Sequence, residues 1–175
     1  MKQNYKTKAQ PSGKWLTLVA ALGFAGTAAA QSLCSSAASS TADEEIYNVM
    51  VNGVNTNPLY SFSNGCSTPA PGAGSLLNRY SNFMSLGSSY TVTQGVVSTF
   101  SVQENECDGP TYYNNGCAIW IDYNQNGVFT DPGEQIYVEN VTTVSPRVIT
   151  GTFVVPFSAT TGTTTMRVIV AEGYS

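Results

Sequence analysis

The side chains best suited to chemistry are concentrated between Asp122 and Glu134. Oxygen-bearing side chains fall at the first, third and fifth positions of this stretch, and Gly127 follows at the sixth. Such spacing suits a short loop around a hard cation, because alternate residues point inward and the glycine permits a sharp turn. The pattern therefore predicts a Ca²⁺ site. Its expected ligands are the side chains of Asp122, Asn124, Asn126, Asp131 and Glu134, with the carbonyl of Val128.

The predicted loop differs from an EF-hand. Gly133 stands at the twelfth position, where an EF-hand has a bidentate glutamate, and Glu134 comes one residue later. The preceding Ala118–Ile121 segment is typical of a buried strand and not of a helix. The alternative to a cation site is a turn-rich hairpin in which the Asn and Asp side chains bond their own backbone.

Catalysis finds little support in the composition. The chain has no histidine, which excludes Ser-His-Asp and Cys-His arrangements and the HExxH zinc site. A pair of carboxylates could still hydrolyse glycosides, which remains a weaker alternative. The other acidic cluster, Glu104, Glu106 and Asp108, is expected to form a solvated loop. We therefore expect no enzymatic activity in this chain.

The first thirty residues are typical of a secretory signal peptide. Lysines precede an apolar run from Trp15 to Ala25, and the small residues 28–30 form a cleavage site. The run is too short to span a bilayer, so the chain is expected to be secreted, or displayed on a bacterial cell surface, with no membrane contact after cleavage. Cleavage would remove all four lysines and leave three arginines against eleven acids, a formal charge of −8. Nucleic acid is therefore not expected as a partner.

The four cysteines, Cys34, Cys66, Cys107 and Cys117, all follow the predicted signal peptide. An even number in a secreted domain predicts two disulfides, for which three pairings are possible. We favour Cys107–Cys117, which would leave Cys34–Cys66. A metal site is the alternative, but the chain has neither a CxxC motif nor a histidine.

Short alternating runs separated by Gly, Pro and Asn predict an all-β fold, an antiparallel β-sandwich of jelly-roll or immunoglobulin-like type. Residues 31–44 form a small, polar N-terminal segment, and 45–175 form one domain. A helical turn or an irregular edge is expected between Ser75 and Ser85. The expected strands are Glu45–Val51, Tyr90–Thr93, Val96–Val102, Ala118–Asp122, Gln135–Val138, Val148–Val155 and Thr164–Val170.

Aromatic residues offer a possible ligand surface. Trp120 could stack on a sugar, although core packing is favoured for it. Tyr112 and Tyr113 lie in the connection before the Trp120 strand, where exposure is more plausible, and they are the first candidates for contact with a ligand.

The run Ile119–Glu134 resembles the centre of the GEVED domains of secreted bacterial proteins. Three other segments are similar to the family in the same order: Leu77–Phe83, Gly151–Pro156 and Gly162–Val168. The Gly-Glu-Val-Glu-Asp segment itself is absent, which leads us to expect that the domain is incomplete and lacks its last strand. The resemblance implies a non-catalytic module that works beside other domains of a larger extracellular protein.

Two functions follow as expectations. The first is a calcium-stiffened module with an adhesion or spacer role in a larger extracellular protein. The alternative is an accessory domain that binds carbohydrate for a secreted hydrolase or protease. The partners would be extracellular glycans, proteins, or other domains of the same polypeptide.

Overall fold

The computed structural model describes residues 37–38, 44–56, 72–76, 79–86, 90–106 and 113–172. The predicted signal peptide, Cys34, Cys66, Cys107, Asp108 and Tyr112 lie outside these ranges. In the described part of the chain the strands are β1 (Glu44–Val51), β2 (Val54–Asn55), β3 (Val97–Glu106), β4 (Asn115–Ile121), β5 (Gln135–Val138), β6 (Arg147–Val154) and β7 (Met166–Glu172). The described residues also include the 3₁₀ turn η2 (Met84–Leu86).

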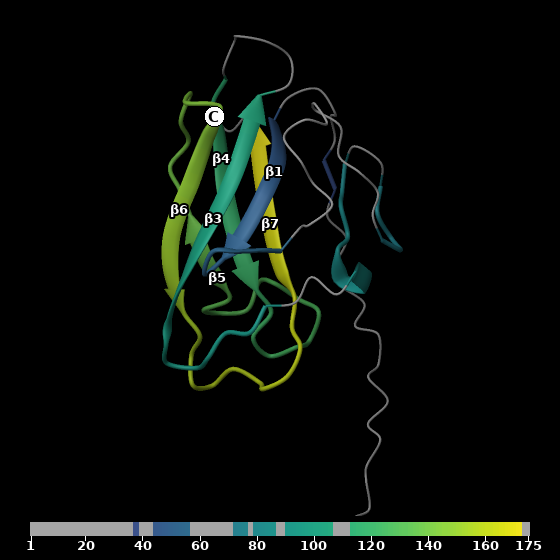
Figure 1. Ribbon diagram of the computed structural model, residues 1–175, viewed down its shortest axis with the longest axis vertical. Coiled ribbons are helices and arrows are strands. Elements are labelled where there is room, and N and C mark those ends of the chain that lie inside the picture. Colours follow the sequence, from purple (N-terminus) through teal and green to yellow (C-terminus); the bar gives the residue numbers. More distant parts are fainter. Residues whose placement is uncertain are drawn as a thin grey trace, which may run out of the picture.

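The strands form two antiparallel sheets that pack face to face as a β-sandwich (Figure 1). The four-stranded sheet has the order β2-β1-β3-β6, and the three-stranded sheet has the order β5-β4-β7. Strand β1 lies against β7, and β5 against β6, across the two layers. The predicted all-β fold is confirmed.

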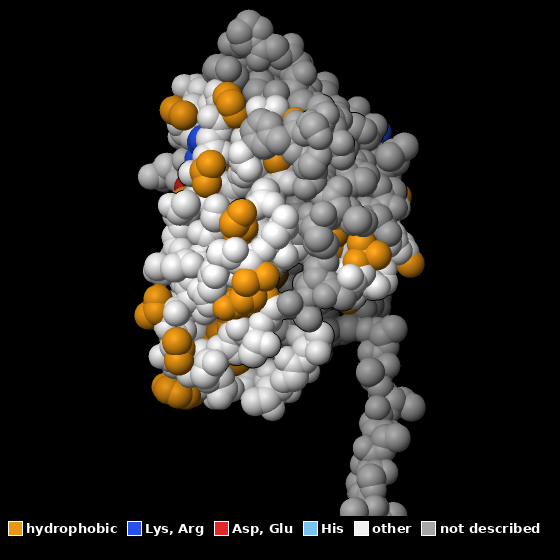
Figure 2. Space-filling model, viewed as in Figure 1, with side chains coloured by type: hydrophobic (Ala, Val, Ile, Leu, Met, Phe, Trp, Pro, Cys, Tyr) orange, Lys and Arg blue, Asp and Glu red, His pale blue; other side chains and the backbone are white. Residues whose placement is uncertain are grey.

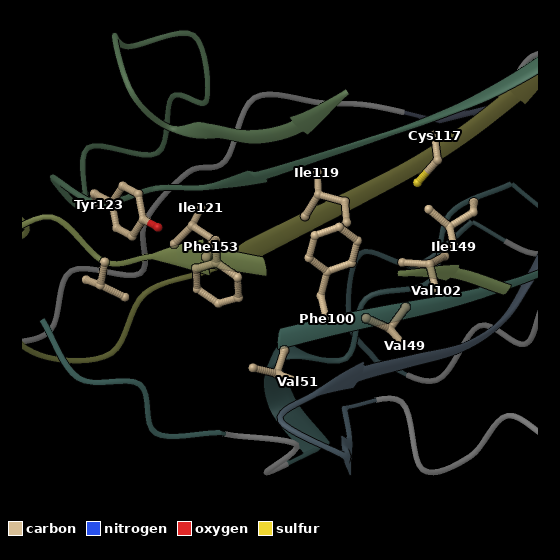
Figure 3. Packing of buried hydrophobic residues seen from close by; sticks show 11 residues of the cluster. Val49, Val51, Phe100, Val102, Cys117, Ile119, Ile121, Tyr123, Ile149 and Phe153 are labelled. Carbon is tan, nitrogen blue, oxygen red and sulfur yellow. The ribbon is translucent and has the colours of Figure 1, made fainter. Parts of the chain in front are cut away.

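Alternation along each strand builds the core. Cys117, Ile119 and Ile121 of β4 point inward, while the residues between them are half-buried on the outer face. Figure 3 shows Ile119 over Phe100 of β3, and Ile121 close to Phe153 of β6. The Phe100 ring also meets Tyr137 edge-on, with centroids 4.9 Å apart. Apolar side chains buried in this way each contribute about 1.5–3 kcal/mol, so the interface between the sheets holds the fold together.

The strand predictions differ from the structure at three places. Residues 90–93 form no strand, although Tyr90 and Val92 pack against the core as their alternation suggests. The hairpin of β1 and β2 was not predicted. Strand β3 continues past Val102 to Glu106, because Glu104 finds a partner inside the protein.

Trp120 does not lie in the core. It is half-buried on the outer face of the three-stranded sheet, opposite Arg167 of β7 in the register. The favoured prediction of core packing was therefore wrong, because the two isoleucines beside it take the inward positions of β4.

Candidate functional site

The loop 122–134 joins β4 to β5 at one end of the sandwich. Its two ends are held together because the Ile121 N–H donates to the carbonyl of Glu134 at 2.9 Å, one step beyond the Trp120–Gln135 pair. Asp122 therefore enters the loop directly from the central strand of its sheet. A rigid strand on each side fixes where the loop begins and ends.

Asp122 organises the first half of the loop. Its side chain is fully buried, and its two oxygens accept the N–H groups of Asn126 (3.1 Å) and Gly127 (2.9 Å). Gly127 has φ +82°, a left-handed conformation that glycine adopts without steric cost. The Asp122 carboxylate thus closes the turn through backbone N–H groups. These side-chain-to-backbone bonds were expected for the turn-rich hairpin, and they are observed.

Asn124 and Asn126 both reach the same oxygen of Asp131. Each side-chain Nδ2 donates to Asp131 Oδ2 at 2.7 Å. The amide oxygens accept backbone N–H groups two residues ahead, from Asn126 (3.0 Å) and Val128 (2.8 Å). The hydrogen bonds from Asn124 and then Asn126 lower the pKa of Asp131, since they favour its charged form.

Glu134 is the carboxylate without full compensation. Its side chain is 2 % exposed, its Oε1 accepts the Asn124 N–H at 3.4 Å, and its Oε2 has no hydrogen-bond partner. Burial is the main cause that raises the pKa of Glu134, and the nearby charges of Asp122 and Asp131 raise it further. Backbone N–H groups oppose this rise only in part.

The predicted ligand residues all lie in this one loop, where Asn124 and Asn126 meet at Asp131. Within the residues that the structure describes, no three His, Cys, Asp or Glu side chains are placed to share a metal ion. Asp122 and Asp131 each accept N–H donors of the loop itself. Val128 is 39 % exposed, and its N–H is used within the loop.

A second loop, residues 157–165, packs on the first. The Thr160 N–H donates to the carbonyl of Tyr123 at 2.7 Å, and Gln125 Nε2 donates to the carbonyl of Thr160 at 3.0 Å. The Asp122 N–H reaches the carbonyl of Thr165 at 3.1 Å. The connection from β6 to β7 is thereby tied to the candidate site.

Phe129 ties the loop to the outer face of the sheet. Its ring is buried, and the Arg167 guanidinium lies 4.2 Å from the ring centroid, a cation–π contact. Arg167 faces Trp120 in the register, so these side chains link the loop to the strands that carry it.

A partly buried ionic network joins residues of the two sheets, and it was not predicted from the sequence. Glu139 accepts two hydrogen bonds from Arg147, from Nη1 at 2.8 Å and Nη2 at 2.5 Å, while Arg147 Nε lies 2.9 Å from Glu104 Oε2. Asn115 Oδ1 accepts a further bond from Nη2 at 2.9 Å. The expectation of a solvated Glu104 was wrong. Its alternation with Phe100 and Val102 could have shown that it faces inward.

Cys117 carries a free, buried thiol. Burial first, and then the charge of Glu139, raises its pKa to about 12. The favoured Cys107–Cys117 bond is thus not formed in this structure, and the other three cysteines lie outside the described residues. Tyr113 is 55 % exposed just before β4, as expected for a contact residue.

Comparison with known proteins finds one similarity. No curated protein and no solved structure matches the chain. No helix in the described ranges has the length and apolar character needed to cross a membrane. Residues 116–175 match the model of the GEVED domain, a family associated with extracellular bacterial proteins. From β4 onward, including the candidate loop, this chain is therefore similar to the GEVED domain family.

Proposed function

We propose that this chain is a non-catalytic module of a larger extracellular protein, exported by residues 1–30, with an adhesion or spacer role. In this proposal the 122–134 loop binds Ca²⁺ and stiffens one end of the sandwich. The observation that best supports the cation site is the buried Oε2 of Glu134, which has no hydrogen-bond partner. The negative charges of Asp122 and Asp131 act on the same carboxyl group. A carboxylate in this position is costly unless a positive charge joins it.

The donor atoms suit a hard cation, and the irregular loop geometry supports calcium over magnesium. The candidate ligands are carboxylate, amide and carbonyl oxygens, which a hard cation prefers. Ca²⁺ accepts six to eight oxygens in flexible geometry, whereas Mg²⁺ demands a near-ideal octahedron. An irregular loop that also uses amide side chains suits the more tolerant ion. Stiffening would extend to residues 157–165, which hydrogen-bond to the same loop.

Calorimetry with Ca²⁺, Mg²⁺ and Mn²⁺ tests the proposal, together with the melting temperature in calcium and in EDTA. We expect heat with Ca²⁺ and a higher melting temperature, because a ligand that binds only the folded state stabilises it by mass action. Glu134→Gln should weaken both effects. Glu45→Gln, which removes a charge from β1, should leave them unchanged. The absence of heat with all three ions would remove the cation site.

A second candidate function is carbohydrate binding in support of an attached hydrolase or protease. The observation that favours it is Tyr113, which is 55 % exposed at the start of β4. Affinity for an insoluble polysaccharide, lost in Tyr113→Ala and in Tyr112→Ala, would support this function. A failure to sediment with cellulose, chitin or peptidoglycan would count against it.

A further inference from the structure

Two side-chain amides of the candidate site converge on one carboxylate oxygen. Asn124 Nδ2 and Asn126 Nδ2 each lie 2.7 Å from Asp131 Oδ2. Two N–H dipoles aimed at one oxygen supply part of the positive potential that a cation would provide. The loop therefore satisfies this carboxylate with its own side chains.

Glu134 provides an independent observation in the same loop. Its side chain is 2 % exposed and Oε2 has no hydrogen-bond partner, so its charge is not matched as that of Asp131 is. The Asn124 N–H joins the two halves of the site, because it donates to Glu134 Oε1 at 3.4 Å. One buried carboxylate oxygen thus remains for a further positive group.

We propose that Asn124 and Asn126 are exchangeable ligands: their amide nitrogens close the loop on Asp131, and Ca²⁺ replaces them there by drawing in their amide oxygens. This inference rests on the proposed function, because it concerns the same ion site. Asp122 stays in place, since each of its oxygens keeps a free lone pair beside the N–H that it accepts.

The exchange is chemically simple for an amide. The oxygen and nitrogen of Asn occupy nearly equal volumes, and the terminal torsion of this side chain is roughly two-fold. A half-turn therefore presents an oxygen where a donor was, with little change in packing. The cost is the bonds that each Asn oxygen now accepts from the backbone, at 3.0 Å and 2.8 Å.

Two consequences follow. The two Asn side chains close the loop on Asp131 through their own hydrogen bonds, so we expect the domain to fold in EDTA. The affinity for calcium is weak, because each binding event breaks hydrogen bonds. Extracellular modules commonly bind calcium with dissociation constants of about 10⁻⁴–10⁻³ M, and weak binding of this kind is expected here.

Paired substitutions of Asn126 test the exchange by calorimetry with Ca²⁺ and by melting in EDTA. Both Asn126→Asp and Asn126→Ala remove a donor to Asp131, so both should lower the melting temperature in EDTA. Their calcium affinities should move in opposite directions, rising about tenfold for the added carboxylate and falling about tenfold for the lost oxygen. Gln125→Asn is the control for a change in this loop that does not touch Asp131. It removes the hydrogen bond to Thr160, and Asn tolerates the left-handed conformation of that position (φ 59°).

The outcomes separate this inference from the proposed function. If both variants melt earlier in EDTA but neither changes the calcium affinity, the side chain is structural only and the exchange is overturned. The same holds if both lower the affinity equally. If the unsubstituted protein gives no heat with Ca²⁺, the proposed function fails, although the EDTA data still test closure on Asp131. An unchanged melting temperature in EDTA would refute that closure.

Discussion

Arg147 serves two carboxylates with one charge. Glu139 takes the bidentate contact, and Glu104 is left with an ion pair at 2.9 Å that lacks hydrogen-bond alignment. Burial therefore dominates at Glu104 and raises its pKa, although Ser145 and Arg147 lower it in part. At Glu139 burial also acts upward, but the bonds from Arg147 and the Cys117 N–H outweigh it, and the pKa is lowered.

The two glutamates are predicted to affect stability with opposite pH dependence. A raised folded pKa means that the stabilisation from Glu104 is complete below its ordinary value of 4.5 and is lost as the pH rises through the folded pKa. The free energy of unfolding of Glu104→Gln, relative to the unsubstituted protein, should therefore increase with pH in that window. Urea denaturation from about pH 3 to 8 measures it.

Glu139→Gln is the matched control for this pH series. The lowered pKa of Glu139 contributes stability that is present above its ordinary value of 4.5 and lost as the pH falls through the folded pKa. The relative stability of Glu139→Gln should therefore decrease as the pH rises. Parallel curves for the two variants would contradict the roles assigned to Arg147.

The buried Cys117 thiol is predicted to resist alkylation in the native protein, since exposure and thiolate formation are both suppressed. Iodoacetamide should label Cys117 only after the protein is unfolded in guanidine, and this labelling should need no reductant. The mass of the peptide that contains Cys117 measures the labelling. If it becomes labelled only when a reductant is also present, then Cys117 is in a disulfide, and the predicted pairing with Cys107 regains support.

At the scale of the strand, β6 is built around a glycine that lies under an aromatic ring. Gly151 pairs with Phe100 in the register, and a Cβ added to Gly151 would lie 2.5 Å from Phe100 Cζ. The ring is 3 % exposed and is held against Tyr137, so it has little room to move. Because Gly151 has no side chain, the Phe100 ring can lie directly over the backbone of the neighbouring strand β6.

Gly151→Ala is predicted to destabilise the domain by about 1–3 kcal/mol, the usual cost of overpacking a core. Gly116→Ala in β4 is the control, because a Cβ there would meet only Val141 Cγ1 at 3.7 Å, an ordinary contact. That change should be neutral or slightly stabilising, since alanine restricts the unfolded chain. Equal costs for both variants in urea denaturation would show that the Phe100 contact is not what matters.

Alternation was sufficient to locate β4, whose inward and outward residues differ clearly in burial. Strand β5 has the predicted bounds, and β7 places Met166, Val168 and Val170 against the core as expected. A two-residue strand such as β2 carries no period to detect. The loop residues were visible from their spacing, but the two amides on Asp131 were not, because their hydrogen bonds depend on how the turn folds back.

At the scale of the whole molecule, the two faces of the four-stranded sheet differ in kind. Figure 2 shows its outer face, where hydrophobic side chains are scattered among uncharged polar ones. Val97, Val148 and Val154 are 61 %, 57 % and 49 % exposed. The inner face carries Val102 and Phe100, which are almost fully buried. Valines of the same sheet therefore lie in two environments, solvent on the outer face and the core on the inner face.

This assignment predicts different costs for one chemical change on β3. Val97→Thr should alter the free energy of unfolding by less than about 0.5 kcal/mol, as is usual at exposed positions. Val102→Thr should lower the free energy of unfolding by about 1–3 kcal/mol, because it buries a hydroxyl group among apolar side chains. Similar midpoints in urea for the two variants would mean that the sheet does not face the core as described.

Trp120 is the only tryptophan among the described residues, and it lies two positions before Asp122 on a strand that enters the loop directly. It faces Arg167, which contacts Phe129 inside that loop. The indole is half-buried, so its fluorescence is sensitive to small changes in the polarity around it. The protein thus contains an intrinsic optical reporter beside its candidate ion site, and emission spectra could follow the state of the loop without any added label.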